Sequence, residues 1–345
     1  MTAVDLVPSL PESRDVADPR PARLRGAATA ALGLVLALAP FMLGDFGTAT
    51  LTRILAFAVL CVSAQLLIGL AGLPTLGQTL YFGVGAYASA ILAVNVTTNG
   101  PLLVLMGGVA GLLAAVLTGW IAVRVSGIVF LMLTLAVGQL SYQVAVTWKS
   151  VTFGSDGFVG IPYFTLLPDG GLPLLDLRQR YWFVLAMVIV VLLVVWVFTR
   201  SPFGRTADGL RENESRLRAL GYTAWLCRYI VFAFAGGVAG VGGALWVSQA
   251  QFFSPDDMNF GVMAIAFVAV VVGGRRSFMG AAAGAAIVLL VRDFVGTHFA
   301  GHGNLLLGVM FLLVVYLMPQ GVSGLASALA RKVLPKWPVE KSATP

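Results

Sequence analysis

The chain has 345 residues, of which 59% are hydrophobic and 11% are charged, and its net charge is +7. A mean hydropathy of +0.91 excludes a soluble globular protein, because so much apolar surface cannot be hidden from water; the surrounding solvent is therefore lipid. The basic excess does not indicate nucleic-acid binding, since the basic residues lie in loops and tails. Cys61 and Cys227 have no metal-ligand spacing and are not expected to form a disulfide.

A series of apolar runs follows a polar, proline-rich tail at residues 1–26. The runs that approach the length of about 20 residues required to span a membrane are 27–44, 51–70, 77–95, 101–122, 126–147, 181–199, 229–249, 258–273, 278–295 and 304–319. They predict an all-α integral membrane protein with about ten transmembrane helices, and eight to ten fit the pattern because one short run could be re-entrant. The 40 glycines suit close packing of such helices.

The distribution of lysine and arginine predicts that both termini are cytoplasmic. With the N-terminus inside, the inner loops and tails hold most of the chain's 22 lysines and arginines, and the opposite orientation inverts this ratio. The chain then divides into a cytoplasmic tail at 1–26, a transmembrane domain at 27–325 and a cytoplasmic tail at 326–345. Residues 148–180 form a long outer loop, and residues 200–228 lie on the cytoplasmic face.

Residues 200–228 form a charged segment between two apolar runs. Ser201 and Pro202 can start a helix, with serine as the N-cap and proline in the first position. An apolar stripe and two Glu–Arg pairs at i,i+4 predict one or two short amphipathic helices that end near Gly221. The stripe is Ala207, Leu210, Leu217 and Leu220, and the pairs are Glu212 with Arg216 and Glu214 with Arg218. The charge pattern alone leaves open a solvated loop helix or a lever that docks on a cytoplasmic partner.

The chain lacks the residues of an ATP-binding or catalytic site. It contains no Gly-Lys pair and therefore no P-loop, and no catalytic constellation is visible. The only histidines, His298 and His302, have i,i+4 spacing, but the intervening Gly301 and the missing glutamate argue against a zinc helix. We expect no enzyme activity, no metal site and no cofactor in this chain.

Neutral polar side chains, rather than charges, occupy the middle of the predicted spans. This argues against an ion-coupled secondary carrier, because such carriers bury a charged residue near the middle of the bilayer. Gln65 is interpreted as an interhelical hydrogen-bonding residue. Gln139 and Gln143 share one helix face, and for them both path lining and helix packing stay open.

Several glycine-rich blocks occur in a fixed order over about residues 50–325. They are GLPTLGQTLYFGVGAYASAIL at 72–92, VRVSGIVFLMLTLAVGQL at 123–140, TFGSDGFVGIP at 152–162, SPFGRTADGLRENESRLRALGY at 201–222, VVVGGRRSFMGAAAGA at 270–285 and MPQGVSGL at 318–325. Each block alone is weak, but together they resemble the LivM-type branched-chain amino-acid permeases. Thr75 and Gln78 depart from the family pattern in the first block, which leaves the solute open.

The resemblance implies the permease subunit of an ATP-binding-cassette importer in the prokaryotic plasma (inner) membrane, for branched-chain amino acids or similar small polar solutes. It implies a LivH-type partner permease, two cytoplasmic ATPase subunits that use ATP and Mg, and an extracytoplasmic solute-binding protein. The charged segment would couple to the ATPases through Leu210, Arg211, Glu212, Asn213, Glu214, Leu217 and Gly221. The alternative is an importer for urea, short amides or other small carboxylates, followed by an ion-coupled secondary carrier.

The break formed by Gly72, Pro74 and Gly77 needs a cavity or neighbouring protein groups to satisfy its freed backbone. The residues expected to line the translocation path are Thr75, Gln78, Tyr81, Gln139 and Gln143. A tight helix crossing is the alternative for the first three. In the outer loop, Ser155 and Asp156 are expected to face the binding protein, although an aspartate before a glycine also suits a plain turn.

Overall fold

The computed structural model describes residues 33, 35–167, 171–274, 277–298 and 308, and the chain divides into two units after Gly44. In the first unit, residues 35–42 are helical, and they are the main described part of the predicted span 27–44. Apart from residue 308, the predicted span 304–319 lies outside the described residues, as do both tails. The features that follow belong to the second unit, which begins at Asp45.

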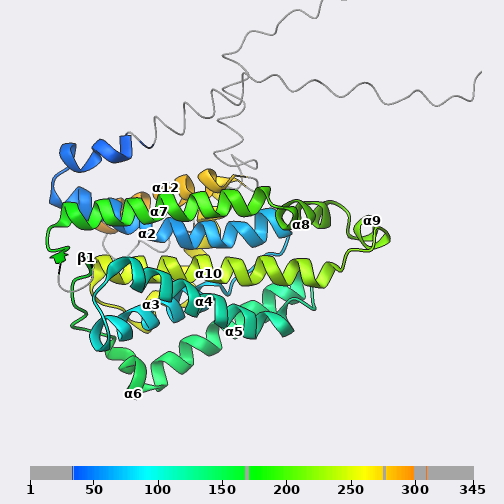
Figure 1. Cartoon of the computed structure of the whole chain (residues 1–345), viewed down its shortest axis with the longest axis horizontal. Helices are drawn as coiled ribbons and strands as arrows, with labels where there is room; N and C mark the ends of the chain where they lie inside the picture. Colours follow the sequence, from blue (N-terminus) through cyan, green and yellow to red (C-terminus); the bar gives the residue numbers. More distant parts are fainter. Residues whose placement is uncertain (1–32, 34, 168–170, 275–276, 299–307, 309–345) are drawn as a thin grey trace, which may run out of the picture. The chain divides into compact units, whose positions relative to one another are not determined.

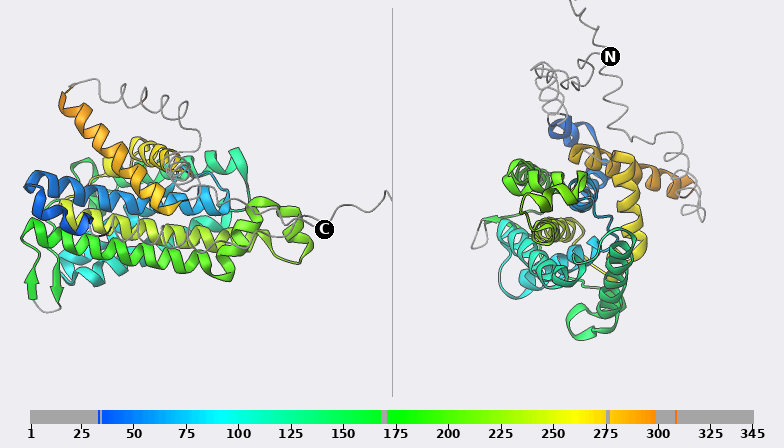
Figure 2. Two further views of the ribbon diagram at one scale, coloured as in Figure 1. Left: turned by 90° about the horizontal axis from the view of Figure 1, so that it is seen from above. Right: turned by 90° about the vertical axis from the view of Figure 1, so that its right-hand side faces the viewer.

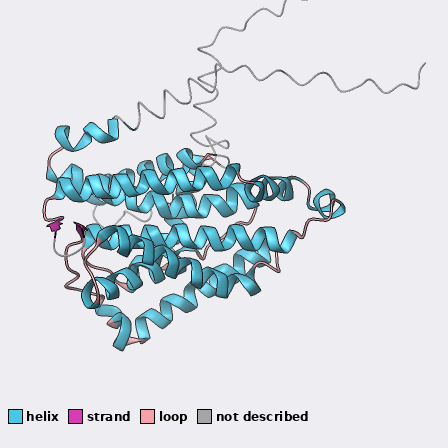
Figure 3. Cartoon of the chain, in the orientation of Figure 1, coloured by secondary structure: helices cyan, strands magenta, loops and turns pink. Residues whose placement is uncertain are grey.

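The second unit is mainly helical (Figure 3). Its elements are α2 (Asp45–Gln65), the π-helix η1 (Leu66–Ala71), α3 (Gln78–Asn95), α4 (Gly100–Ala122), α5 (Gly127–Thr147), α6 (Lys149–Thr152), η2 (Gly154–Asp156), β1 (Thr165–Leu167), β2 (Gly171–Pro173), α7 (Leu177–Arg200), α8 (Pro202–Glu212), α9 (Glu214–Ala219), α10 (Ala224–Ala250), η3 (Pro255–Met258), α11 (Phe260–Gly273) and α12 (Phe278–His298). The two short strands pair antiparallel in the loop before α7.

Each predicted span from 51–70 to 278–295 coincides with a helix, the shortest of which is the 14-residue α11, so the helical reading of these apolar runs is confirmed. In the described part of the chain, six helices are long and apolar enough to cross a membrane. The β1–β2 hairpin was not predicted, because its strands are only three residues long and carry no alternating pattern. It is a small addition to an otherwise helical unit.

Glycine sets the closest helix contacts, and many of them involve α10. This helix packs against α2, α3 and α4, as the views in Figures 1 and 2 show. A Cβ atom at Gly243 would overlap the Phe82 carbonyl oxygen, and a Cβ at Gly111 would lie 2.6 Å from the Gly236 carbonyl oxygen. Larger side chains would separate these backbones, so the predicted packing role of glycine is confirmed at these crossings.

The charged segment and the outer loop lie at opposite ends of the long helices of this unit. Figure 1 shows α8 and α9 at one end, and α6 and β1 at the other. A single helix, α7, runs from the hairpin at one end to the charged segment at the other. This is the arrangement expected if the two regions face opposite sides of a membrane.

Candidate translocation and coupling sites

The break predicted between the second and third spans is present at residues 72–77. The π-helix η1 ends at Gly72, which has a left-handed backbone (φ +69°), and α3 begins at Gln78. Thr134 of α5 accepts a hydrogen bond from the Leu76 amide at 3.2 Å, and the Thr75 hydroxyl accepts one from the Gly77 amide at 3.3 Å. Protein groups therefore satisfy part of the freed backbone, as membrane depth requires.

The three side chains predicted to line a path at this break are all buried. Thr75 and Gln78 are 0% exposed, and Tyr81 is 3% exposed. Tyr81 has a packing role, because its hydroxyl hydrogen-bonds the Thr118 hydroxyl at 2.7 Å and its ring meets Phe232 edge-on. Gln78 differs, since neither its amide nitrogen nor its amide oxygen has a hydrogen-bond partner among the described residues.

Gln139 and Gln143 do not join this cluster. Both lie on the exposed face of α5. Between them, Tyr142 donates a hydrogen bond to Asp256 at 3.3 Å. The sequence grouped these two glutamines with Gln78, but among the described residues they face outwards and do not lie beside it.

The outer loop presents Ser155 and Asp156 to the surroundings, and both are exposed. Backbone hydrogen bonds hold the loop, since the Phe158 and Phe253 amides each donate to the other residue's carbonyl, at 2.7 Å and 3.2 Å. Phe153 adopts a left-handed backbone (φ 62°), which is unusual for a residue with a large side chain. The position of Asp156 suits both a docking role and a plain turn.

The charged segment folds as the two short helices α8 and α9, as predicted. The Ser201 hydroxyl accepts a hydrogen bond from the Gly204 amide at 3.3 Å, which confirms the N-cap. Gly221 has a left-handed backbone (φ +85°), and its amide donates to the Arg218 carbonyl at 3.0 Å. The predicted Glu214–Arg218 pair is present at 2.5 Å. The other predicted pair depends on the Arg216 side chain, which lies outside the described part of the structure.

Two of the residues that the resemblance assigns to the ATPase contact, Leu210 and Arg211, point towards other helices of this chain. Leu210 is 3% exposed, because α8 lies against η1, α7 and α10. The Arg211 guanidinium donates a hydrogen bond to the Gly69 carbonyl in η1. Glu212 and Asn213 are exposed at the junction of α8 and α9, and Leu217 is half-buried. The stripe periodicity identified an apolar face but not the element that covers it.

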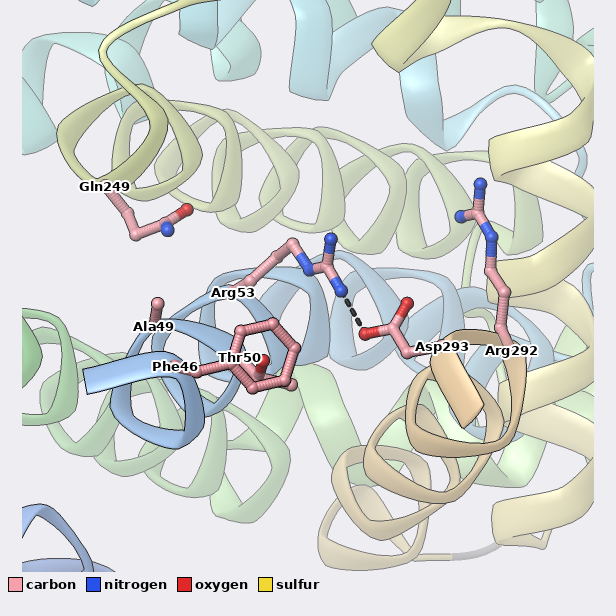
Figure 4. Close-up of a pocket in the computed structure, with 7 residues that line it drawn as sticks. All are labelled: Phe46, Ala49, Thr50, Arg53, Gln249, Arg292 and Asp293. Carbon is pink, nitrogen blue, oxygen red and sulfur yellow. Dashed lines mark hydrogen bonds and ion pairs between the residues drawn. The ribbon is translucent and has the colours of Figure 1, made fainter. Parts of the chain in front are cut away.

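A polar pocket of about 480 Å³ lies between α2, α10 and α12. Arg53 of α2 reaches across it and forms an ion pair with Asp293 of α12 (Figure 4). Arg292 and Gln249 also line the pocket. No local pattern in the sequence indicates this pairing, since 240 residues separate Arg53 from Asp293.

The six described helices long enough to cross a membrane, the interrupted helix and the charged surface segment fit a multi-pass membrane protein. Residues 47–315 match the family model described as "Branched-chain amino acid transport system / permease component". The chain therefore belongs to this family of ABC-type transporter permeases, and it is a protein of the plasma (inner) membrane.

Two groups of relatives were found. The high-affinity branched-chain amino acid transport system permease protein LivM of Escherichia coli (strain K12) is 30% identical over an alignment of 316 residues that covers 84% of this chain and 73% of the relative. The autoinducer 2 import system permease protein LsrC of Photorhabdus laumondii is 29% identical over an alignment of 190 residues that covers 49% of this chain and 56% of the relative. No solved structure matches the chain. The resemblance to LivM-type permeases is confirmed.

Proposed function

We propose that this chain is the translocating subunit of an ATP-driven importer for branched-chain amino acids or similar small polar solutes. The proposal is supported by membership of the permease family and by the similarity to LivM. The observation that carries the translocation role is Gln78, a fully buried amide without a partner among the described residues, placed directly after a broken helix.

An amide in this position is unfavourable unless something else binds it. A buried polar group without a hydrogen bond costs about 1–3 kcal/mol, which water or a solute would offset when the path opens. The amide nitrogen of Gln78 can donate to a solute carboxylate, and the amide oxygen can accept from a solute ammonium group. A neutral side chain makes both contacts without exchanging a proton, which suits a path for zwitterions that is driven by ATP rather than by an ion gradient.

Two chains would form the full path. Gln139 and Gln143 are exposed on α5, and amides that faced lipid would lack partners. A LivH-type partner permease on this face of α5 would bury both amides and place them at the boundary between the two permeases. In this arrangement Thr75 and Gln78 belong to the inner wall of the path, and Tyr81 supports that wall through Thr118.

The charged segment at 200–228 is proposed to face two cytoplasmic ATPase subunits, which bind ATP and Mg and carry out the hydrolysis. The exposed junction of α8 and α9, with Glu212 and Asn213, is the part available for this contact. Leu217 and Gly221 shape the adjoining turn, and Leu210 supports α8 from beneath. Both termini are then cytoplasmic, and the loop with Ser155 and Asp156 faces an extracytoplasmic binding protein.

Uptake by the reconstituted assembly tests the proposal. With permeases, ATPases and binding protein in proteoliposomes, Gln78→Leu should reduce uptake of labelled L-leucine by at least about tenfold, since it removes both hydrogen-bonding groups. The matched control is Gln65→Leu, because Gln65 is also buried but its amide nitrogen donates to the Gly274 carbonyl at 3.4 Å, so that only its oxygen has no partner among the described residues. Uptake by Gln78→Leu at the wild-type rate, with the assembly intact, would overturn the path assignment.

A different small solute is the second candidate. The relatives named as autoinducer 2 import permeases indicate that related permeases serve other import systems. The candidates are distinguished by a competition assay in the same vesicles. It measures uptake of labelled leucine in the presence of unlabelled amino acids, urea, short amides or small carboxylates. If only valine, isoleucine and leucine suppress leucine uptake, the amino-acid assignment is supported. If an amide shows saturable uptake and leucine is not taken up, an amide importer replaces the amino-acid assignment.

A further inference from the structure

Arg211 joins the charged segment to the break in the transmembrane helix. It lies in the last turn of α8, and its Nη1 atom donates a hydrogen bond to the Gly69 carbonyl in η1, 142 residues earlier in the chain. Neither a solvated loop helix nor a direct ATPase contact requires an arginine to point inwards at this position. The contact therefore needs its own explanation.

The Gly69 carbonyl accepts from Arg211 because its donors within the helix are lost. In an α-helix its donor would be the Leu73 amide, but that amide donates to the Leu67 carbonyl at 2.9 Å. In a π-helix its donor would be residue 74, which is Pro74 and has no N–H. The end of η1 thus leaves an open carbonyl, and a guanidinium satisfies it while also neutralising the negative end of the helix dipole.

The contact is built from the other side as well. Gly72 provides room for the arginine stem, since a Cβ atom at this position would lie 2.9 Å from Arg211 Cγ. Gly72 also has the left-handed backbone (φ +69°) that ends η1. Glycine therefore suits position 72 for two reasons: it leaves space for the Arg211 side chain, and it adopts the left-handed backbone readily. Both features lie at the junction of α8 and η1.

Arg211 also lies between two regions that matter for transport. The next two residues of the chain, Glu212 at the end of α8 and Asn213 after it, are at the exposed junction proposed to face the ATPases. On the other side of the contact, Gly72 begins the short break that leads to Gln78 and α3. The neighbouring residue of α8, Leu210, is buried. Since Arg211 belongs to α8, a displacement of α8 would change the position of the guanidinium relative to η1.

We propose that Arg211 is a positioning residue that transmits movement of α8 to the break before α3, rather than a contact to the ATPases. The inference rests on the proposed import function for the origin of that movement. The proposed link is one charged hydrogen bond. Its donor, the Arg211 guanidinium, is carried by α8, and its acceptor, the Gly69 carbonyl, lies at the end of η1 before the break. Loss of the bond should leave ATP hydrolysis in place and separate it from transport.

The experiment compares variants in the full assembly by transport per ATP hydrolysed. Arg211→Met keeps the aliphatic stem and removes the donors, and we expect this ratio to fall by about tenfold while hydrolysis continues. Arg211→Lys keeps one charged donor and should recover part of the ratio. The matched control, Arg205→Met, changes an exposed arginine of the same helix and should keep the wild-type ratio. An unchanged ratio in Arg211→Met, or equal loss of hydrolysis and transport, would overturn the proposal.

Wild-type protein provides a second measurement that does not depend on folding of a variant. Hydrogen exchange of the assembly with and without a non-hydrolysable ATP analogue should change protection in α8 and in residues 66–77 together. A change confined to α8 would contradict the proposal. The ratio is defined for whatever solute the assembly carries, and Gln78→Leu reports on the path alone. Failure of the proposed function is therefore distinguishable from failure of the Arg211 link.

Discussion

The Glu214 carboxylate accepts a hydrogen bond from the Arg228 guanidinium at 2.7 Å, and this ion pair ties α9 to the first turns of α10. The Arg228 side chain is 14% exposed and that of Glu214 is 33% exposed, so water only partly screens the pair. Without this tie, α9 is held mainly by its backbone connections to α8 and α10. We therefore expect the pair to help order the surface proposed to meet the ATPases.

Arg228→Gln is expected to loosen α9 without unfolding the transmembrane helices. A partly exposed ion pair contributes about 1 kcal/mol, which corresponds to roughly a fivefold increase in local opening. Hydrogen exchange of residues 214–219 measures this opening, with Arg205→Gln as the control. Equal protection of α9 in both variants would show that the pair does not hold it.

The same pair predicts a dependence of α9 on pH. Partial burial alone would raise the pKa of Glu214, but the charges of Arg228 and Arg218 outweigh it and the pKa is lowered from the ordinary glutamate value. The stabilisation is therefore fully present above the ordinary glutamate pKa and is lost as the pH falls through the lowered folded-state value. After correction for intrinsic exchange rates, opening of α9 should increase at acid pH, whereas Glu214→Gln should show a flat profile.

Gly72→Ala should destabilise the permease more than a left-handed backbone alone explains. The new methyl group would meet the Arg211 stem at 2.9 Å, in addition to the strain at φ +69°. Gly127→Ala is the matched control, since Gly127 has φ +65° with no atom within 4 Å of the added Cβ. We expect about 1 kcal/mol for the control and about 2–3 kcal/mol for Gly72→Ala in thermal unfolding of the solubilised protein. Equal losses would exclude a steric role for Arg211.

Gly243→Ala tests the crossing of α3 and α10. The added methyl group would overlap the Phe82 backbone, which cannot move aside as a flexible side chain can, and overpacking of this kind costs about 1–3 kcal/mol. Gly209→Ala in α8 meets only the tip of Leu217 at 3.3 Å and should be close to neutral. The melting temperature of each variant in detergent measures the difference, and a neutral Gly243→Ala would contradict the close approach.

The Arg53–Asp293 ion pair should couple α2 to α12 in a double-mutant cycle. Asp293→Asn leaves the Arg53 charge without its partner and is expected to cost about 1–2 kcal/mol, less than for a fully buried pair because the side chains are 38% and 28% exposed. The Arg53→Gln/Asp293→Asn variant should lose less than the sum of the single changes. Strict additivity of the three unfolding free energies would show that the pair contributes no coupling.

The parts of this fold that depend on short stretches of sequence could be predicted. Apolar length gave the long helices, Ser201 and Pro202 gave the start of α8, and Gly72 with Pro74 gave the break. Each is a property of neighbouring residues, and the chain there has few alternatives.

Side-chain direction over long sequence distances could not be predicted in the same way. Arg211 meets a carbonyl 142 residues away, so a pattern within α8 cannot reveal it. The positions of Gln139 and Gln143 also depend on which face of α5 the rest of the chain covers. Periodicity identifies that two residues share a face, but only the packed helices determine whether that face is inside.

The glycine contacts of α10 also limit how this protein can move. Gly236 and Gly243 bring α10 into backbone contact with α4 and α3, and helices joined in this way cannot slide past one another without separating. If the chain carries out transport as proposed, we expect these helices to shift together as one rigid block. Conformational changes would then occur around this block, at positions where a helix is interrupted or where helices contact each other only through side chains.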